Sequence, residues 1–203
     1  RKDAKKLAEQ LSFGRLSCIH IPSEMEEQAR LLTRLRTTQM KERSRTTCRI
    51  KSLLMQYGYM ELTTDKSASR AWIKEVLSNN YPAELAYVLK YHCEQWLLLT
   101  EALKETLKQL AMQTKSSEEL QHLEAIYRSV PGIGNISAKE LSRELGDLSQ
   151  FKNNKSLYSF TGLTPSEYSS GDKIRRGSIS QCCRPRIRHI LIEVAWRSVY
   201  KDK

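Results

Sequence analysis

Hydrophobic positions recur at helical spacing through most of the chain, and this pattern predicts a mostly α fold. The most regular stretch is a helix predicted over residues 83–115. Its apolar and small positions alternate at spacings of four and three: Leu85, Leu89, His92, Trp96, Leu99, Leu103, Thr106 and Leu110. A heptad seam of this length is typical of a helix that packs against another helix. At 1.5 Å per residue the helix is roughly 50 Å long, which favours an antiparallel partner helix.

The partner helix is predicted over residues 23–57. Ser23 and Glu26 have the Ser-x-x-Glu spacing of a capping box, and Gly58 is expected to end the helix. The two ends of this helix are apolar, whereas its middle is basic, with Lys41, Arg43, Arg45 and Arg49. Two interpretations of this basic stripe stay open: a solvated face of the helical hairpin, or a surface that contacts a nucleic-acid backbone.

Shorter helices are predicted at residues 1–12, 68–78, 117–129, 136–145, 153–160 and 186–200. Ser116 and Glu119 repeat the capping-box spacing ahead of the 117–129 helix. The inward residues of that helix are expected to be Leu120, Leu123 and Ile126. The core stripe of the last helix is predicted to be Ile187, Ile190, Leu191, Val194, Ala195 and Val199.

Breaks in the helical pattern divide the chain into three predicted regions: residues 1–22, 23–115 and 116–203. The first region ends in the short apolar run 18–21, which predicts one strand between Gly14 and Pro22. The second is a long antiparallel, coiled-coil-like hairpin. The third is a compact helical domain that contains an irregular loop.

The composition indicates a soluble, folded protein with a polyanionic partner. Of the 203 residues, 39% are hydrophobic and 28% charged, and the net charge is +11. Nucleic acid is the polyanion that fits best, and a basic helix on a membrane surface is the competing explanation. No apolar run approaches the roughly 18 residues needed to span a bilayer, so no membrane segment is expected.

The five cysteines are odd in number and show no Cys-x-x-Cys spacing, and the four histidines are scattered. This predicts reduced thiols in a cytosol and no structural metal site. His92 lies on the heptad seam without a second ligand at helical spacing. It is therefore expected to be a polar core position.

The segment from Phe160 to Arg188 carries the chemistry. It opens with Gly-Leu-Thr-Pro and then presents two serines before Gly171. From Lys173 onward it has six cations and no acidic residue: Lys173, Arg175, Arg176, Arg184, Arg186 and Arg188. Cations of this kind hold a phosphate, and a hydroxyl beside them can reach phosphorus. On these residues alone, a solvated basic loop remains the alternative.

A second candidate contact is the turn Val130-Pro-Gly-Ile-Gly, which precedes the 136–145 helix. Gly132 and Gly134 would let backbone N–H groups approach a phosphate, and the next helix offers its positive end. This arrangement is typical of a helix-hairpin-helix element. A tight turn between two helices needs only the glycines, so both interpretations stay open.

The order of these motifs resembles one known family. Pro-Gly-Ile-Gly, Glu-Leu-Gly-Asp, a Phe, Gly-Leu-Thr-Pro, Ser-Gly, Arg-Arg-Gly and Ile-Ser precede an Ile-Arg and a last helix. The same order is found in the C-terminal domain of the bridge-RNA-guided insertion-sequence transposases, relatives of the Piv/MooV DNA invertases. The chain departs from the family after Ile179-Ser180. It reads Gln-Cys-Cys-Arg where the family reads Lys-x-Gly-Asn.

The resemblance implies a role for several residues. The family's proposed nucleophile is the serine directly before the glycine, which is Ser170 here. Arg175, Arg176 and Arg188 would then stabilise charge at phosphorus. The family also has an N-terminal RuvC-like nuclease domain that ends in Asp-x-x-Asp-Ala. Asp3-Ala4 matches its second aspartate, so residues 1–22 would be a remnant of that domain and Asp3 a ligand for Mg²⁺, with the other acids before Arg1.

The function implied is that of a DNA transposase or recombinase that uses a guide RNA and a covalent phosphoserine intermediate. Its partners would be DNA, the guide (bridge) RNA and further copies of the chain, as a dimer or tetramer through the helical hairpin. It would work in a prokaryotic cytosol, associated with the nucleoid. Two alternatives stay open for this chain: a non-catalytic nucleic-acid-binding fragment, or a helical assembly module.

Overall fold

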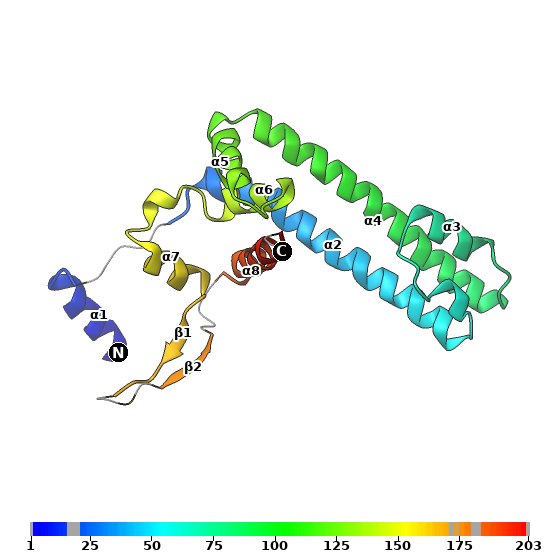
Figure 1. Ribbon diagram of the computed structural model, residues 1–203, viewed down its shortest axis with the longest axis horizontal. Coiled ribbons are helices and arrows are strands. Elements are labelled where there is room, and N and C mark those ends of the chain that lie inside the picture. The colour runs from blue at the N-terminus through cyan, green and yellow to red at the C-terminus, as the bar shows by residue number, and fades with distance from the viewer. Residues whose placement is uncertain (1, 16–20, 171–172, 174, 180–183, 202–203) are drawn as a thin grey trace.

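A computed structural model confirms the mostly α fold (Figure 1). It describes residues 2–15, 21–170, 173, 175–179 and 184–201. The helices are α1 (Lys2–Ser12), α2 (Glu24–Gln56), α3 (Arg70–Ser78), α4 (Ala83–Lys115), α5 (Glu118–Ser129), α6 (Asn135–Glu144), α7 (Asn154–Thr161) and α8 (Pro185–Lys201). Strands β1 (Pro165–Glu167) and β2 (Arg176–Ile179) pair antiparallel, and 3-10 turns lie at Met60–Leu62 and Leu148–Gln150.

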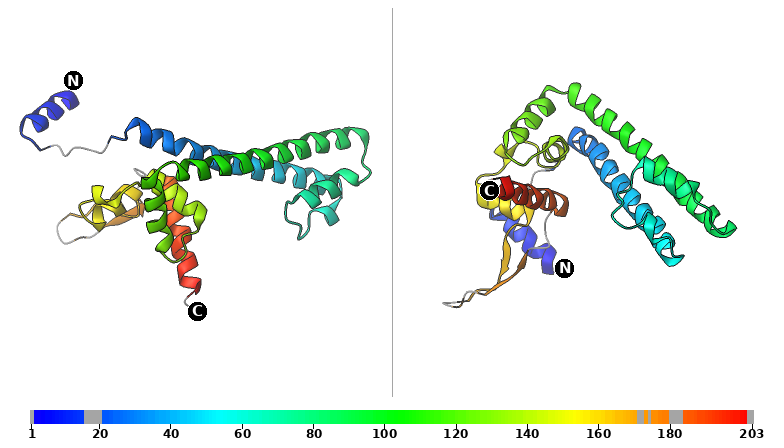
Figure 2. Two further views of the ribbon diagram at one scale, coloured as in Figure 1. Left: turned by 90° about the horizontal axis from the view of Figure 1, so that it is seen from above. Right: turned by 45° about the vertical axis from the view of Figure 1, so that its right-hand side comes forward.

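Helices α2 and α4 lie side by side and antiparallel, as the seam predicts, and form the long hairpin in both views of Figure 2. The capping box is confirmed: the Glu26 N–H donates to the Ser23 hydroxyl (3.3 Å), and the Ser23 N–H donates to the Glu26 carboxylate (2.6 Å). The chain leaves α2 through Gly58, whose φ of +86° suits glycine.

The predicted seam of α4 faces α2. Leu85, Leu89, Trp96, Leu103, Thr106 and Leu110 are buried, and His92 and Leu99 are half-buried. Two polar contacts between the helices fix their register. The Trp96 indole N–H donates to the Thr47 hydroxyl (3.0 Å), and the Thr106 hydroxyl donates to the Gln39 side chain (3.0 Å).

The hairpin and the C-terminal helices have separate hydrophobic cores. At the far end of the hairpin, α3 packs across α2 and α4 around Ile50, Leu54, Ile73, Val76 and Leu89. The second core joins α5, α6 and α8 through Tyr127, Ala138, Leu141, Leu145, Ile187, Ile190 and Val194. The predicted boundaries at residues 22 and 115 nevertheless stay predictions.

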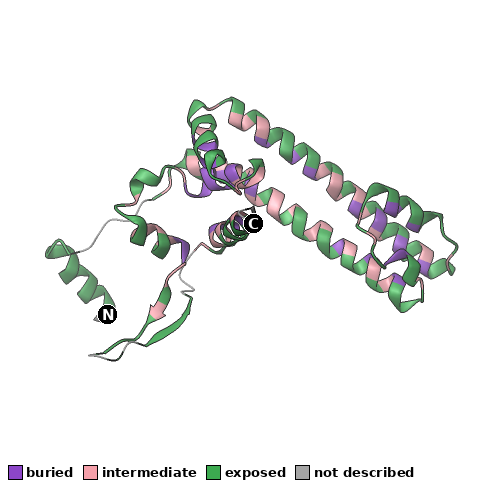
Figure 3. Cartoon of the chain, in the orientation of Figure 1, coloured by how far each residue is buried: buried purple, intermediate pink, exposed green. Residues whose placement is uncertain are grey.

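The irregular loop predicted after residue 160 is an extended hairpin instead. Strands β1 and β2 project from the second core and are exposed along most of their length (Figure 3). The strand pattern was not recognised in the sequence because neither face is buried, so no apolar alternation marks it. The predicted strand at residues 18–21 falls almost entirely outside the described residues.

Two details of α5 differ from the prediction. Ser117, and not Ser116, caps the helix, since its hydroxyl accepts from the Leu120 N–H (3.3 Å). Ile126 is 46% exposed, whereas Tyr127 is buried. The buried face of α5 is therefore defined by its contact with α6, which the local apolar spacing did not reveal.

The core stripe of α8 is shorter than predicted. Ile187, Ile190 and Val194 are buried, but Ala195 and Val199 are exposed. The left panel of Figure 2 gives the reason: the last turns of α8 extend beyond the other helices of the second core. Among the described residues, no helix has both the length and the apolar character to cross a membrane.

The seam yields a stability prediction. Leu89→Ala removes a side chain that is 1% exposed and should lower the free energy of unfolding by about 2–5 kcal/mol. Leu98→Ala is the matched control in the same helix, because Leu98 is 72% exposed and should change the value by less than about 0.5 kcal/mol. Urea denaturation of both variants tests this. Equal losses would contradict the assigned face of α4.

Candidate active site

Ser170 lies near the tip of the hairpin formed by β1 and β2. Its backbone N–H donates to the Lys173 carbonyl (3.2 Å), and the Lys173 N–H donates back to the Ser170 carbonyl (3.3 Å). Further down, the Tyr168 N–H donates to the Arg175 carbonyl (2.9 Å). Gly171, which follows the two serines, lies outside the described residues.

The structure distinguishes the two adjacent serines. The Ser169 hydroxyl donates to the Glu167 carboxylate (2.6 Å) and accepts from the Arg175 N–H (3.2 Å), so it is engaged within the hairpin. The Ser170 side chain is exposed, and within the described part of the chain its hydroxyl has no hydrogen-bond partner. Of the two hydroxyls, that of Ser170 is available to a ligand.

The glycine of the Arg-Arg-Gly motif has a structural explanation. The Ser166 hydroxyl crosses from β1 to donate to the Ser178 carbonyl (3.0 Å). A Cβ atom at Gly177 would collide with this hydroxyl, so a larger residue would displace the Ser166 side chain. Gly177 thus leaves room for the hydrogen bond between Ser166 and Ser178.

The six candidate cations fall into two groups. Lys173, Arg175 and Arg176 are exposed on the hairpin, where they can meet a phosphate. The other three, Arg184, Arg186 and Arg188, are half-buried at the start of α8. They interact with the protein itself.

Two of these arginines contact the chain just before the serine segment, defined here as residues 163–179. Arg184 stacks over the Phe160 ring (5.0 Å to the centroid), and the Arg188 Nη1 donates to the Gly162 carbonyl (3.5 Å). Both contacts reach the point at which the chain leaves α7. Arg188 therefore contacts the residue directly before the serine segment.

One carboxylate of α6 gathers arginines from two other helices. Glu144 is 5% exposed and accepts from the Nε (3.0 Å) and Nη2 (3.3 Å) of Arg34 in α2. Its oxygens also lie 3.5 Å from the Arg184 Nη1 and 3.8 Å from the Arg186 Nη1. We name these four residues the Glu144 junction. One turn earlier, Glu140 accepts from Arg36 of α2 (3.0 Å).

The neighbouring residue, Arg143, faces the opposite way and is 3% exposed. Its guanidinium donates to Gln113 (2.9 Å), Glu124 (2.8 Å) and Thr114 (3.1 Å), at the corner between α4 and α5. Lys139 donates to the second oxygen of Glu124 (2.8 Å). We name these five residues the Arg143 network.

The two glycines of the Pro-Gly-Ile-Gly turn have different surroundings. Gly132 has a φ of +87°, and a Cβ there would lie 2.9 Å from the Ser198 hydroxyl and 3.0 Å from the Val194 carbonyl of α8. Its small size is explained by helix packing. Gly134 is exposed and has open space around it, and the approach of a phosphate stays a prediction for both glycines.

Some residues of the basic stripe of α2 contact other residues of the protein, and others are exposed to solvent. Arg43 lies over the Trp96 ring (5.7 Å), and Arg45 pairs with Glu42 (2.5 Å). Lys41 and Arg49 are exposed. Packing against α4 accounts for Arg43, and only the exposed members of the stripe could meet another molecule.

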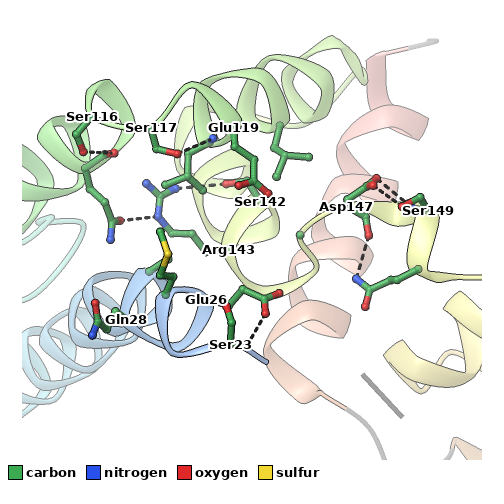
Figure 4. A pocket seen from close by; sticks show the side chains of 17 residues that line it. Ser23, Glu26, Gln28, Ser116, Ser117, Glu119, Ser142, Arg143, Asp147 and Ser149 are labelled. Atoms are coloured by element: carbon green, nitrogen blue, oxygen red, sulfur yellow. Dashed lines mark hydrogen bonds between the residues drawn. The ribbon is translucent and has the colours of Figure 1, made fainter. Parts of the chain in front are cut away.

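A cavity of about 730 Å³ lies where the start of α2, the corner between α4 and α5, and the end of α6 meet (Figure 4). Serine caps and carboxylates line it, including Ser23, Glu26, Glu119 and Asp147, with Arg143 at its wall. The hydrogen bonds of Arg143 are directed to its protein partners. The acidic lining makes this cavity unsuited to a phosphate.

Asp3 lies on the exposed helix α1, which the left panel of Figure 2 shows separated from the hairpin and the second core. Among the described residues, no three His, Cys, Asp or Glu side chains come together as metal ligands. A Mg²⁺ site takes its protein ligands from several carboxylates. The described residues therefore do not fit a Mg²⁺ site on their own.

Comparison with known proteins places the chain among transposases. Residues 124–203 match the family described as Transposase IS116/IS110/IS902, and residues 1–59 match a second family, DEDD_Tnp_IS110, described as Transposase. The two ends of the chain therefore match domains of IS110/IS116/IS902-type transposases.

Two relatives illustrate the similarity. The chain is 26% identical over 200 residues to the transposase for insertion sequence element IS1111A of Coxiella burnetii, covering 96% of the chain and 53% of that protein. It is 24% identical over 193 residues to the transposase for insertion sequence element IS1328 of Yersinia enterocolitica, covering 95% of the chain and 56% of that protein. The chain spans about half the length of the curated relatives it matches.

Sequence reasoning missed the buried charges of α6. Glu140, Arg143 and Glu144 are all at least 92% buried, although they interrupt an apolar stripe that the sequence shows clearly. Their spacing in the sequence could have revealed this burial. Charged side chains directly beside Leu141 and Leu145 lie partly on the face of the helix that packs into the core.

The Arg143 network gives a prediction about acid stability. Burial alone would raise the pKa of Glu124, but hydrogen bonds from Lys139, Arg143 and Thr114 hold it below the ordinary value of 4.5. Since the folded-state pKa is the lower one, Glu124 stabilises the fold above pH 4.5, and this contribution is lost as the pH falls through the folded-state pKa. As the pH falls below 4.5, the Glu124→Gln variant should therefore lose less free energy of unfolding than the parent.

Glu140→Gln is the control with the opposite sign. Burial raises the pKa of Glu140 despite the attraction of Arg36, so protonation in acid favours its folded state. Removing this group should make the loss of stability in acid steeper. Urea denaturation at a series of pH values measures both effects, and parallel pH profiles for the two variants would contradict the assignment.

Proposed function

We propose that this chain is the part of a DNA transposase that supplies the serine nucleophile, and that the nucleophile is Ser170. The observation that carries the proposal is the contrast between two neighbouring hydroxyls, because Ser169 is engaged by Glu167 and Arg175 whereas Ser170 is exposed. The match to transposase domains suggests the reaction class, and the cations beside Ser170 suit a phosphodiester.

In the proposed step, the Ser170 Oγ attacks the phosphorus of a DNA strand. The new Oγ–P bond replaces one P–O bond to a sugar, whose oxygen leaves and takes up a proton, while the serine gives up its own. The strand is then held as a phosphoserine ester, and attack by a sugar hydroxyl reverses the step and joins a strand.

Charge stabilisation is assigned to the exposed cations of the hairpin. Ser170 and Lys173 pair across the hairpin, and Arg175 and Arg176 follow Lys173 by two and three residues. Their exposed guanidinium groups can therefore approach a phosphate held beside Ser170. A positive environment favours the deprotonated form of the hydroxyl and stabilises negative charge on the phosphoryl oxygens. Arg188 acts indirectly in this proposal, through its contact with Gly162.

The remaining features of the proposal concern partners that the chain would meet. A guide RNA would select the DNA site, further copies would assemble through the α2–α4 hairpin, and Asp3 would join carboxylates from outside this chain around Mg²⁺. No reaction step is assigned to the metal, because the described residues do not form its site.

A salt titration tests whether the hairpin binds the backbone. Three phosphate contacts from Lys173, Arg175 and Arg176 correspond to a slope of roughly −2.7 in log K against log salt, or about a fortyfold loss between 50 and 200 mM. Changing all three to Gln should reduce the slope by about that amount. The measurement is fluorescence anisotropy with a labelled DNA duplex.

The matched control changes three exposed lysines of α4 to Gln: Lys90, Lys104 and Lys108. The net charge changes equally, so an equal fall in slope would indicate general attraction and not binding by the hairpin. If the parent shows no binding at all, the assembly-module alternative is favoured.

Covalent trapping tests the nucleophile. In the complete protein with its RNA, Ser170→Ala should abolish a covalent DNA adduct and leave the dissociation constant within a few-fold. Ser169→Ala is the control and should retain the adduct. Denaturing gels detect the adduct, and mass spectrometry maps the attachment. An adduct on another residue contradicts the assignment, and binding without any adduct favours the non-catalytic alternative.

A further inference from the structure

We infer that Glu144 is a positioning residue that couples the long α2–α4 hairpin to the serine segment. This inference rests on the proposed function, because it gives the Glu144 junction a role in placing Ser170. It also explains the first residue of the Glu-Leu-Gly-Asp motif, which the proposed chemistry does not use.

The geometry links three elements through one carboxylate. Arg34 comes from α2, whereas Arg184 and Arg186 lie at the start of α8, directly after the segment that returns from the serine hairpin. Arg34 makes two hydrogen bonds to Glu144, and both α8 arginines lie within ion-pair distance. Glu140, one turn earlier, pairs with Arg36 of α2 and is also attracted by Arg186, but among the described residues it forms its ion pair with α2 alone.

Arg184 and Arg188 also contact the chain just before the serine segment. Arg184, held by Glu144, stacks on Phe160, and Arg188, one turn along α8, donates to the Gly162 carbonyl. The beginning of the segment therefore depends on the placement of α8, which Glu144 connects to α2.

The charge balance makes Glu144 the component that cannot be spared. Three guanidinium groups converge on the Glu144 carboxylate, which is 95% buried. If the charge of this carboxylate were removed, the guanidinium groups would repel one another. Removal of the carboxylate charge leaves three partly exposed guanidinium groups without their shared buried partner, which is more disruptive than losing a fully exposed pair. The motif's other residues serve the same end of α6: Leu145 is in the core, and Gly146 accepts a hydrogen bond from Tyr127 (2.9 Å).

The test compares Glu144→Gln with Glu27→Gln. Glu27 also accepts from Arg34 (3.2 Å) and from the buried Arg30 (2.6 Å), but its side chain is 48% exposed and both of these pairs lie within α2, so the comparison separates loss of a pair within α2 from loss of the link to α8. Hydrogen–deuterium exchange of this chain should show amides of residues 163–179 exchanging about tenfold faster in Glu144→Gln, as expected for partial loss of a local network. Amides of the α2–α4 seam should be unchanged in Glu144→Gln, and in Glu27→Gln the amides of residues 163–179 should exchange as in the parent.

The second readout is the rate of adduct formation in the complete protein at saturating DNA. Glu144→Gln should slow this rate about tenfold or more, which corresponds to about 1.4 kcal/mol, with the dissociation constant within a few-fold. A merely structural role would weaken binding and rate together. If the parent forms no adduct, the proposed function fails, and the exchange experiment alone decides the inference.

Arg34→Met keeps the test informative if Glu144→Gln does not fold, because it breaks the link on the α2 side and leaves Glu144 with its two α8 partners. Residues in one network are non-additive, so the double variant should exchange no faster than Glu144→Gln alone. Additive effects, or unchanged exchange of residues 163–179 in both single variants, would overturn the inference.

Discussion

The structure depends on two adjacent residues of opposite charge at the end of α6. Arg143 and Glu144 are both buried, and a buried charge needs partners that replace its lost hydration. Arg143 finds them at the corner between α4 and α5, and its carbonyl accepts from Arg30 of α2 (2.9 Å). Glu144 finds them in α2 and α8. The hairpin and the second core therefore meet where two buried charges need partners from α2, α4, α5 and α8 together.

The sequence predicted the elements whose determinants are local. The capping box of α2 and the seam of α4 are patterns within one helix, and both are confirmed. The serine hairpin was missed because its strands have no buried face. Ser116 was preferred over Ser117 because the spacing to Glu119 fits a capping box, whereas the actual cap is selected by where α4 ends and turns.

The candidate site shows the same division. The sequence located the serine segment and its cations, but it could not rank Ser169 against Ser170, since only the hydrogen bonds across the hairpin distinguish the two hydroxyls. Exposed Arg175 and internally paired Arg184 also look alike in a sequence. Their different roles follow from Glu144, a residue some 30 to 40 positions away that no local pattern connects to them.

The shape of the long hairpin has a mechanical consequence. Helix α2 is held near its N-terminal end by Arg30, Arg34 and Arg36, while α3 and the first core lie towards its other end. Over about 40 Å of rigid helix, a rotation of roughly 10° at the held end moves the far end by about 7 Å. The position of the hairpin tip is therefore far more sensitive to the packing at the Glu144 junction than the position of any residue beside that junction.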